Sequence, residues 1–199
     1  LRTYVLFMGD YGAAAPWNDS SVRGCKRFLE RVAGLTDIMT DEPAAKDMEV
    51  KIHKAIKKVS SDIEAMKFNT AIACLMTLIN EIYAVGKISK DDLVIFIKLL
   101  CPFAPHLCEE IWETIGGEGL LSLSQWPEYE ESKTIEASVE IGVQVNGKVR
   151  GTIVIPNGCA KEEALEIAKK DERVASFLEG KTLVKEIYVP NKIVNFVAK

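Results

Sequence analysis

The chain has 199 residues, of which 48% are hydrophobic, and carries a formal net charge of -4 at pH 7. This length allows one large domain or two small ones, and the composition is that of a globular protein. No uninterrupted apolar run approaches the roughly 18 residues that a membrane span needs. Five scattered cysteines in mainly apolar settings indicate reduced thiols. We therefore expect a cytoplasmic protein with no membrane partner.

The charge is unevenly distributed. Residues 136–199 contain 10 Lys and Arg against 9 Asp and Glu, whereas residues 1–135 contain 15 against 20. The two regions thus carry net charges of +1 and -5. A polyanionic partner would have to bind local basic patches, because no uniformly positive surface is available.

Residues up to about 115 follow a helical period. A polar run at 18–21 can cap a helix whose apolar stripe starts at Val22. We predict a charged, exposed helix over 43–66, an apolar helix from Phe68 to Gly86, a central helix starting at Ser89 and a last one over 106–115. Ser89 with Asp92 resembles a capping box. This pattern predicts an antiparallel helix bundle.

The first of these helices carries four cations on the side opposite its apolar stripe. They are Arg23, Lys26, Arg27 and Arg31. Such a row can neutralise phosphates, but it can equally be a solvated face on which Glu30 pairs with some of the cations. The sequence leaves both interpretations open.

After residue 137 the period becomes two. We predict strands on both sides of residues 146–147, a helix over 160–178 and short strands over about 182–189 and 192–197. Residues 118–135 show no clear period and are interpreted as a wrap over the bundle followed by a linker. The predicted fold class is α+β: a helix bundle over 1–130, a linker over 131–136 and a small β-β-α-β-β domain over 137–199.

The hairpin at 143–151 (VQVNGKVRG) has two cations just after its turn, Lys148 and Arg150. A two-residue Asn-Gly loop would put the apolar sets of the two strands on opposite faces of the sheet. We therefore predict a three-residue loop, 145–147, with Gly147 as a bulge residue. In this arrangement Val143 pairs with Val149, Ile141 with Gly151, Val139 with Ile153 and Gln144 with Lys148. Lys148 and Arg150 then both face outward, with Gly142 opposite Arg150.

Several motifs resemble the leucyl-tRNA synthetase family of the bacterial type. The motif at 102–112 (PFAPHLCEEIW), followed by Trp126-Pro127, is similar to one shared by several class I synthetases. The segment 67–72 (KFNTAI) resembles a helix start in the middle of the family's bundle. The hairpin 143–151 is similar to the one that opens the leucyl enzyme's C-terminal domain, and Pro190, Lys192, Val194 and Asn195 match the close of that domain. The resemblance covers essentially the whole chain, as the C-terminal third of such an enzyme.

The resemblance implies a parent that attaches leucine to its tRNA with ATP and magnesium. It also implies that the catalytic and editing domains lie before residue 1, so that this chain alone has no catalytic residues and binds no cofactor. The bundle would lie along the inner side of the leucine tRNA, and the small domain would reach its elbow. Candidate tRNA contacts are Lys148, Arg150, Lys192, Arg23, Lys26, Arg27 and Arg31. The sequence gives no oligomerisation signal, and we expect a monomer.

Other patterns favour simpler explanations. The spacing of Cys101, His106 and Cys108 fits no usual zinc pattern, so we predict no metal site. His53 is expected to be solvated, and Trp17 is more typical of a packing anchor than of a base-stacking residue. The segment 87–91 (KISKD) mimics the family's ATP-contacting lysine loop, but Ser89 is better interpreted as a helix cap. An alternative function is a free-standing RNA- or protein-binding adaptor.

Overall fold

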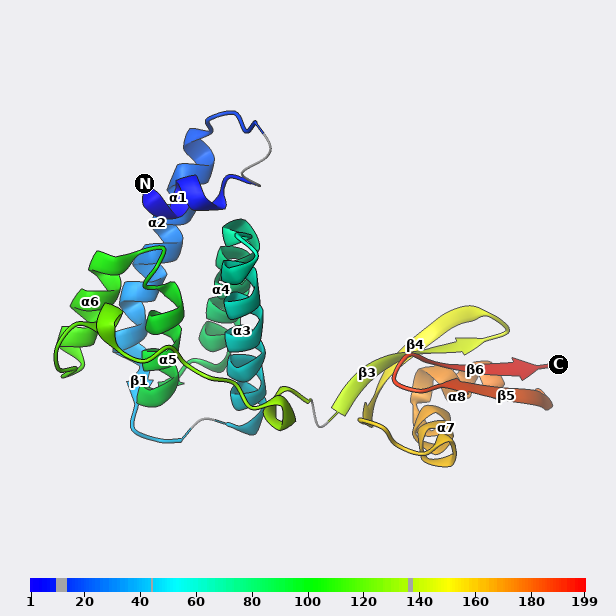
Figure 1. The fold of residues 1–199 in the computed structure, drawn as a ribbon. Helices are drawn as coiled ribbons and strands as arrows, with labels where there is room; N and C mark the ends of the chain where they lie inside the picture. The colour runs from blue at the N-terminus through cyan, green and yellow to red at the C-terminus, as the bar shows by residue number, and fades with distance from the viewer. Residues whose placement is uncertain (10–13, 44, 136–137) are drawn as a thin grey trace. The chain divides into compact units, whose positions relative to one another are not determined.

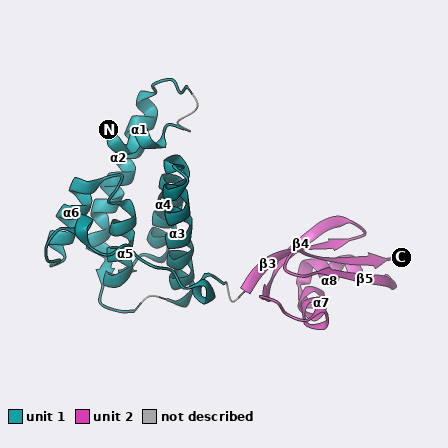
Figure 2. Ribbon diagram, in the orientation of Figure 1, with its two compact units in different colours: residues 1–135 teal, residues 136–199 magenta. Residues whose placement is uncertain are grey.

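The computed structural model describes residues 1–9, 14–43, 45–135 and 138–199 (Figure 1). The chain divides into two compact units, residues 1–135 and 136–199, as Figure 2 shows. The first is built mainly of helices and the second combines a four-stranded sheet with two helices, so the predicted α+β class is confirmed. Ala44, Glu136 and Ala137, which fall within the predicted helix, linker and first strand, lie outside the described residues.

Unit 1 is a bundle with one short strand pair. Its helices are α1 (Arg2–Phe7), α2 (Asp19–Ala33), α3 (Lys46–Glu64), α4 (Phe68–Val85), α5 (Lys90–Leu100) and α6 (Pro105–Thr114). Strands β1 (Met39–Thr40) and β2 (Ile88–Ser89) pair in parallel. Three 3-10 turns complete the described unit: η1 (Gly34–Ile38), η2 (Leu121–Leu123) and η3 (Glu131–Thr134).

Local capping signals set several helix ends. The Asn18 side chain accepts hydrogen bonds from the amides of Ser20 and Ser21 at the start of α2. The Ser89 hydroxyl accepts the Asp92 amide at the start of α5, which confirms its interpretation as a cap. Gly86 ends α4 with a φ of 78°, a left-handed conformation that glycine adopts without a Cβ penalty.

Helix α3 differs from the exposed helix predicted over 43–66. Its polar face is solvated, but Ile52, Ile56 and Val59 are buried in the bundle core, where α3 packs along α4. By length and composition alone α4 could cross a membrane. In this fold its apolar face, including Leu75 and Ile79, is buried in the core of the bundle. Burial between helices explains the hydropathy of α4.

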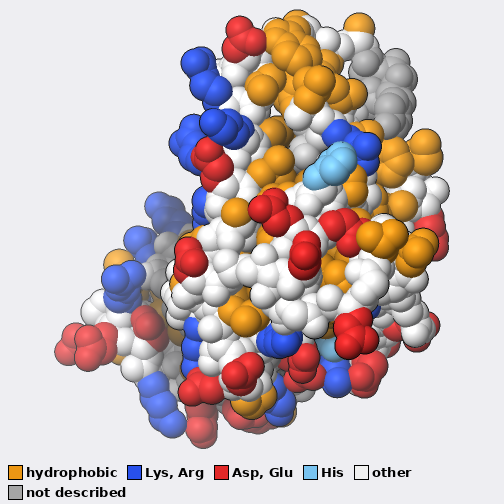
Figure 3. Space-filling model, turned by 90° about the vertical axis from the view of Figure 1, so that its left-hand side faces the viewer, with side chains coloured by type: hydrophobic (Ala, Val, Ile, Leu, Met, Phe, Trp, Pro, Cys, Tyr) orange, Lys and Arg blue, Asp and Glu red, His pale blue; other side chains and the backbone are white. Residues whose placement is uncertain are grey.

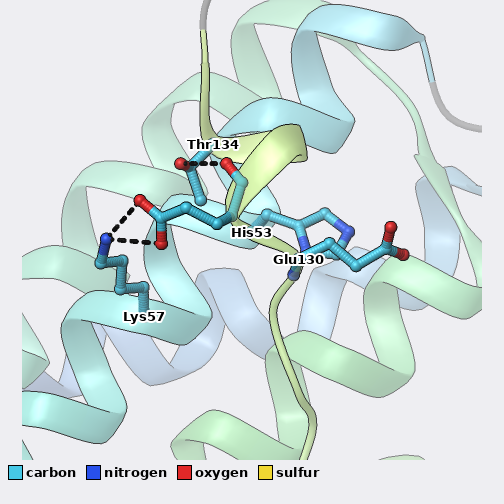
Figure 4. A network of polar contacts seen from close by, with 5 residues as sticks. His53, Lys57, Glu130 and Thr134 are labelled. Carbon is cyan, nitrogen blue, oxygen red and sulfur yellow. Dashed lines mark hydrogen bonds and ion pairs between the residues drawn. The ribbon is translucent and has the colours of Figure 1, made fainter.

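The segment from Trp126 to Thr134, which we call the strap, packs along α3. The Glu130 amide donates a hydrogen bond to His53 Nδ1 at 3.1 Å, and Lys57 Nζ lies 2.7 Å from a carboxylate oxygen of Glu131 (Figure 4). The His53 side chain is half-exposed, and its bond to Glu130 is a contact with the strap beyond the solvation expected for it. Within the predicted linker, Glu131–Thr134 form η3, which these contacts hold on α3.

Unit 2 has the strand order β4-β3-β6-β5. Its strands are β3 (Ser138–Val145), β4 (Lys148–Pro156), β5 (Leu183–Val189) and β6 (Ile193–Ala198). The two hairpins meet where β3 and β6 pair in parallel. The predicted helix 160–178 is instead two helices, α7 (Lys161–Lys170) and α8 (Glu172–Leu178), because Asp171 accepts the Val174 amide and starts a new helix. Both helices cover one face of the sheet, over Val143 and Phe196.

Candidate nucleic-acid interface

The turn between β3 and β4 has two residues. Asn146 and Gly147 have φ values of 51° and 77°, and Val145 lies directly opposite Lys148. The predicted three-residue loop with a bulged Gly147 is therefore wrong. The Asn146 side chain explains part of the difference, because it exchanges two 2.9 Å hydrogen bonds with the Ala198 main chain in β6. These bonds hold Asn146 in the left-handed conformation that the turn needs.

A β-bulge three residues after the turn places the apolar side chains of β3 and β4 on the same face of the sheet. Gln144 pairs with Val149 and Val143 pairs with Gly151, which leaves Arg150 as the extra residue. Ile141 then faces Ile153, so none of the predicted cross-strand pairs forms. The Val149 side chain is 61% exposed on the face of the sheet away from the helices. Beyond the bulge the apolar residues of β4 face the core.

The bulge brings Arg150 against α8. Its guanidinium carbon lies 4.3 Å from the centroid of the Phe177 ring, a cation–π contact, and its buried Nε has no hydrogen-bond partner among the described residues. The prediction that Lys148 and Arg150 face outward together is wrong. Lys148 is exposed at the tip and makes no ion pair within the described part of the chain.

Lys192 lies at the other end of the sheet from the hairpin tip. The parallel register places Ile193 beside Gly142 and Phe196 beside Val145. Three residues of strand separate these two levels, which is about 10 Å. The structure does not bring Lys192 and Lys148 together.

Two lysines that the sequence did not single out lie near the hairpin tip. Asn146 binds the Ala198 main chain, the next residue is Lys199, and the main chains of Lys199 and Thr182 exchange hydrogen bonds of 3.0 and 2.8 Å. Lys181 precedes Thr182, and its ammonium donates to the Phe177 carbonyl at 2.8 Å. We call Lys148, Arg150, Lys181 and Lys199 the basic end of unit 2. Strand pairing alone brings these residues together, so no sequence signal could have found the set.

The four cations of α2 have different environments. Arg31 donates to Asn80 Oδ1 at 2.6 Å and lies 4.7 Å from the Tyr83 ring centroid, so it links α2 to α4. Lys26 lies 3.5 Å from a Glu30 carboxylate oxygen. Arg23 and Arg27 are exposed and make no ion pair among the described residues. On the face shown in Figure 3, lysine and arginine side chains lie among aspartate and glutamate side chains and form no continuous basic surface.

The environment of Cys101 and Cys108 does not favour a reactive thiolate or a metal ligand. Cys101 and Cys108 are buried in the bundle, and burial raises the pKa of both thiols, which keeps them protonated. No group of three or more metal-binding side chains is found in the described ranges. Trp17 packs edge-on against Tyr4 at 4.9 Å between ring centroids, and its indole N–H donates to Asp19.

Comparisons with known proteins agree with this architecture. Residues 45–165 match the family described as the anticodon-binding domain of tRNA ligase. The chain is 46% identical to a leucine–tRNA ligase of Alkaliphilus oremlandii and 43% identical to one of Chlorobaculum tepidum. It is covered completely in both comparisons but spans only 25% and 26% of those proteins.

A solved structure matches along the whole length of the chain. It is the ternary complex of the Agrobacterium radiobacter K84 agnB2 LeuRS with tRNA and LeuAMS, with a TM-score of 0.77 and 31% identity over the whole of this chain and 28% of that one. The resemblance to leucyl-tRNA synthetases is confirmed. The chain belongs to the anticodon-binding domain family of tRNA ligases.

Proposed function

We propose that this chain is the non-catalytic tRNA-binding part of a leucine–tRNA ligase, in which it positions leucine tRNA. The family match carries this proposal, together with the exposed cations at the basic end of unit 2. In the whole enzyme the ATP and magnesium chemistry belongs to other domains. The chain is proposed to act as a monomer.

Each unit would contact the RNA differently. In unit 2, the basic end holds Lys148 and Lys199, which make no ion pair among the described residues, and Arg150 and Lys181, which both contact Phe177. This placement suits the closely spaced phosphates of a folded tRNA elbow. In unit 1, Arg23 and Arg27 lie four residues apart on α2 and project without competing ion pairs in the described structure. Arg31 and Lys26 contribute less, because each already has a protein partner. Lys192 would contact a separate phosphate or none.

Titration of leucine tRNA at several salt concentrations tests the proposal. Lys148→Ala combined with Lys199→Ala should weaken binding and reduce the salt slope by about 0.7 to 0.9 per lost phosphate contact. Lys161→Ala is the matched control, because Lys161 is an exposed lysine at the start of α7, outside the basic end. Equal losses in the control and the double variant would contradict a local interface. Charging of tRNA by the isolated chain would contradict a non-catalytic role.

A further inference from the structure

Unit 2 contains two Asn-Gly dipeptides, Asn146-Gly147 at the hairpin tip and Asn157-Gly158 in the loop after β4. The other five asparagines of the chain precede larger residues. Asparagine deamidates most readily before glycine, because glycine has no Cβ to hinder attack by its own main-chain nitrogen. The two pairs are identical in sequence, so the fold decides which of them reacts.

The deamidation reaction needs water and no other reactant. The glycine main-chain nitrogen loses its proton and bonds to the asparagine Cγ, and the side-chain nitrogen takes up a proton and leaves as ammonia. The product is a cyclic succinimide, which one water molecule opens to aspartate or isoaspartate. To react, the asparagine side chain must turn so that its Cγ meets the glycine nitrogen. Contacts that hold the side chain elsewhere therefore slow the reaction.

The glycine nitrogens of the two pairs have similar environments. The Gly147 amide donates to Asn195 Oδ1 at 3.3 Å, and the Gly158 amide donates to Asn191 Oδ1 at 3.1 Å. Both glycines have left-handed φ values, 77° and 72°. A difference in reactivity must therefore come from the asparagine side chains.

The Asn146 side chain is fixed at both ends by the main chain of β6. Its Nδ2 donates to the Ala198 carbonyl and its Oδ1 accepts the Ala198 amide, both at 2.9 Å. Ala198 is buried, and β6 is paired with β3 on one side and β5 on the other. Turning Asn146 towards the Gly147 nitrogen would break both bonds and leave two main-chain groups without their partners.

The Asn157 side chain contacts another exposed side chain. Its Oδ1 accepts a 2.7 Å hydrogen bond from Asn191 Nδ2, and the same Asn191 amide group accepts the Gly158 N–H. Asn191 lies in the exposed turn between β5 and β6, so it can follow a movement of Asn157. A donor to Asn157 Oδ1 also favours the attack, because negative charge develops on that oxygen.

We propose that Asn157 is a site of spontaneous deamidation and that β6 protects Asn146 from the same reaction. Deamidation of Asn157 adds one negative charge to the loop after β4, which changes the net charge of residues 136–199 from +1 to 0. At Asn146 the new carboxylate would lie at the basic end and could not donate to the Ala198 carbonyl. The fold thus protects the asparagine on which the hairpin turn depends.

Peptide mapping by mass spectrometry tests the proposal, with the chain incubated at mildly alkaline pH both folded and in urea. In urea the two asparagines should react at similar rates, because the unfolded chain holds neither side chain. In the folded chain Asn146 should react at least about 10-fold more slowly than Asn157, the effect of breaking two hydrogen bonds. Asn157→Gln should remove the fast product and leave the slow reaction of Asn146 unchanged.

Three results would overturn the proposal. Equal rates at Asn146 and Asn157 in the folded chain would show that Ala198 gives no protection. A rate at Asn157 about 10-fold or more below its rate in urea would show that Asn191 protects this residue as well. Rapid hydrogen exchange of the Ala198 amide, which the bond to Asn146 Oδ1 should slow, would show that the protecting contact does not persist in solution.

Discussion

Replacing Asp92 with asparagine should stabilise unit 1 at neutral pH, although it removes a charge from the first turn of α5. The Asp92 side chain is only 7% exposed, and its Oδ2 has no hydrogen-bond partner among the residues that the structure describes. A buried charged group without a partner costs roughly 1–3 kcal/mol. A negative charge at a helix N-terminus stabilises the helix by roughly 0.3–1 kcal/mol. The Ser89 side chain still caps the Asp92 backbone amide in the variant. The expected net gain in the free energy of unfolding is about 1 kcal/mol.

The sign of the pH dependence follows from the direction of the pKa shift. Burial raises the pKa of Asp92 above its ordinary value, which is about 3.9. The folded state therefore binds this proton more tightly than the unfolded state does, and the wild type loses that contribution as the pH rises through the raised pKa. The advantage of asparagine should be complete above the raised pKa, shrink as the pH falls towards about 3.9, and vanish below it.

Urea unfolding, from neutral pH down to about pH 4, measures this difference. Asp91→Asn is the matched control, because Asp91 is the adjacent residue in the same first turn but is exposed. It should lose roughly 0.3–1 kcal/mol through the helix dipole alone. If both variants lose the same stability at neutral pH, Asp92 has a protein partner in solution.

Three further changes test the local geometry. Gly117→Ala should destabilise unit 1 by about 1–3 kcal/mol in urea unfolding, because an added Cβ would overlap the Trp112 indole; an unchanged midpoint would contradict this packing. Gly147→Ala should cost unit 2 roughly 1 kcal/mol, since Gly147 has a φ of 77° in a two-residue turn, and unaltered thermal unfolding would favour a longer loop. His53→Ala should speed hydrogen exchange of the Glu130 amide by about 5-fold or more, and equal exchange in both proteins would show that the strap does not depend on His53.

Features that depend on a few neighbouring residues were predictable from the sequence. The Asn18 and Ser89 caps and the glycine end of α4 are local, because the capping atoms lie within four residues of their partners. The break between α7 and α8 at Asp171 is also local. It was missed because the helical spacing of apolar residues continues across Asp171. The contact of His53 with Glu130 joins residues distant in the chain, so the composition around His53 gave no sign of this bond to the strap.

The hairpin shows why a correct constraint can still predict the wrong geometry. The apolar residues of β3 and β4 must share one face, and this demands an extra residue somewhere in β4 or in the loop. Parity does not say where that residue lies. Hydrogen bonds between Asn146 and Ala198 hold the turn at two residues, so the extra residue moves to Arg150, where stacking on Phe177 gives it a partner. Both interactions come from parts of the chain that strand pairing brings to the hairpin.

The same pairing changes which cations can act together. Because β3 and β6 run parallel, the hairpin tip meets the end of β6 and not its beginning, which separates Lys148 from Lys192. Antiparallel pairing of β5 with β6 then carries Lys181 to the level of Lys199. An RNA contact at the tip would therefore depend on residues from three segments, and on Arg150 only if its contact with Phe177 opens. If Arg150→Ala lowered tRNA affinity more than Lys148→Ala did, the cation–π contact would have to open on binding, and Phe177→Leu would then strengthen the contribution of Arg150.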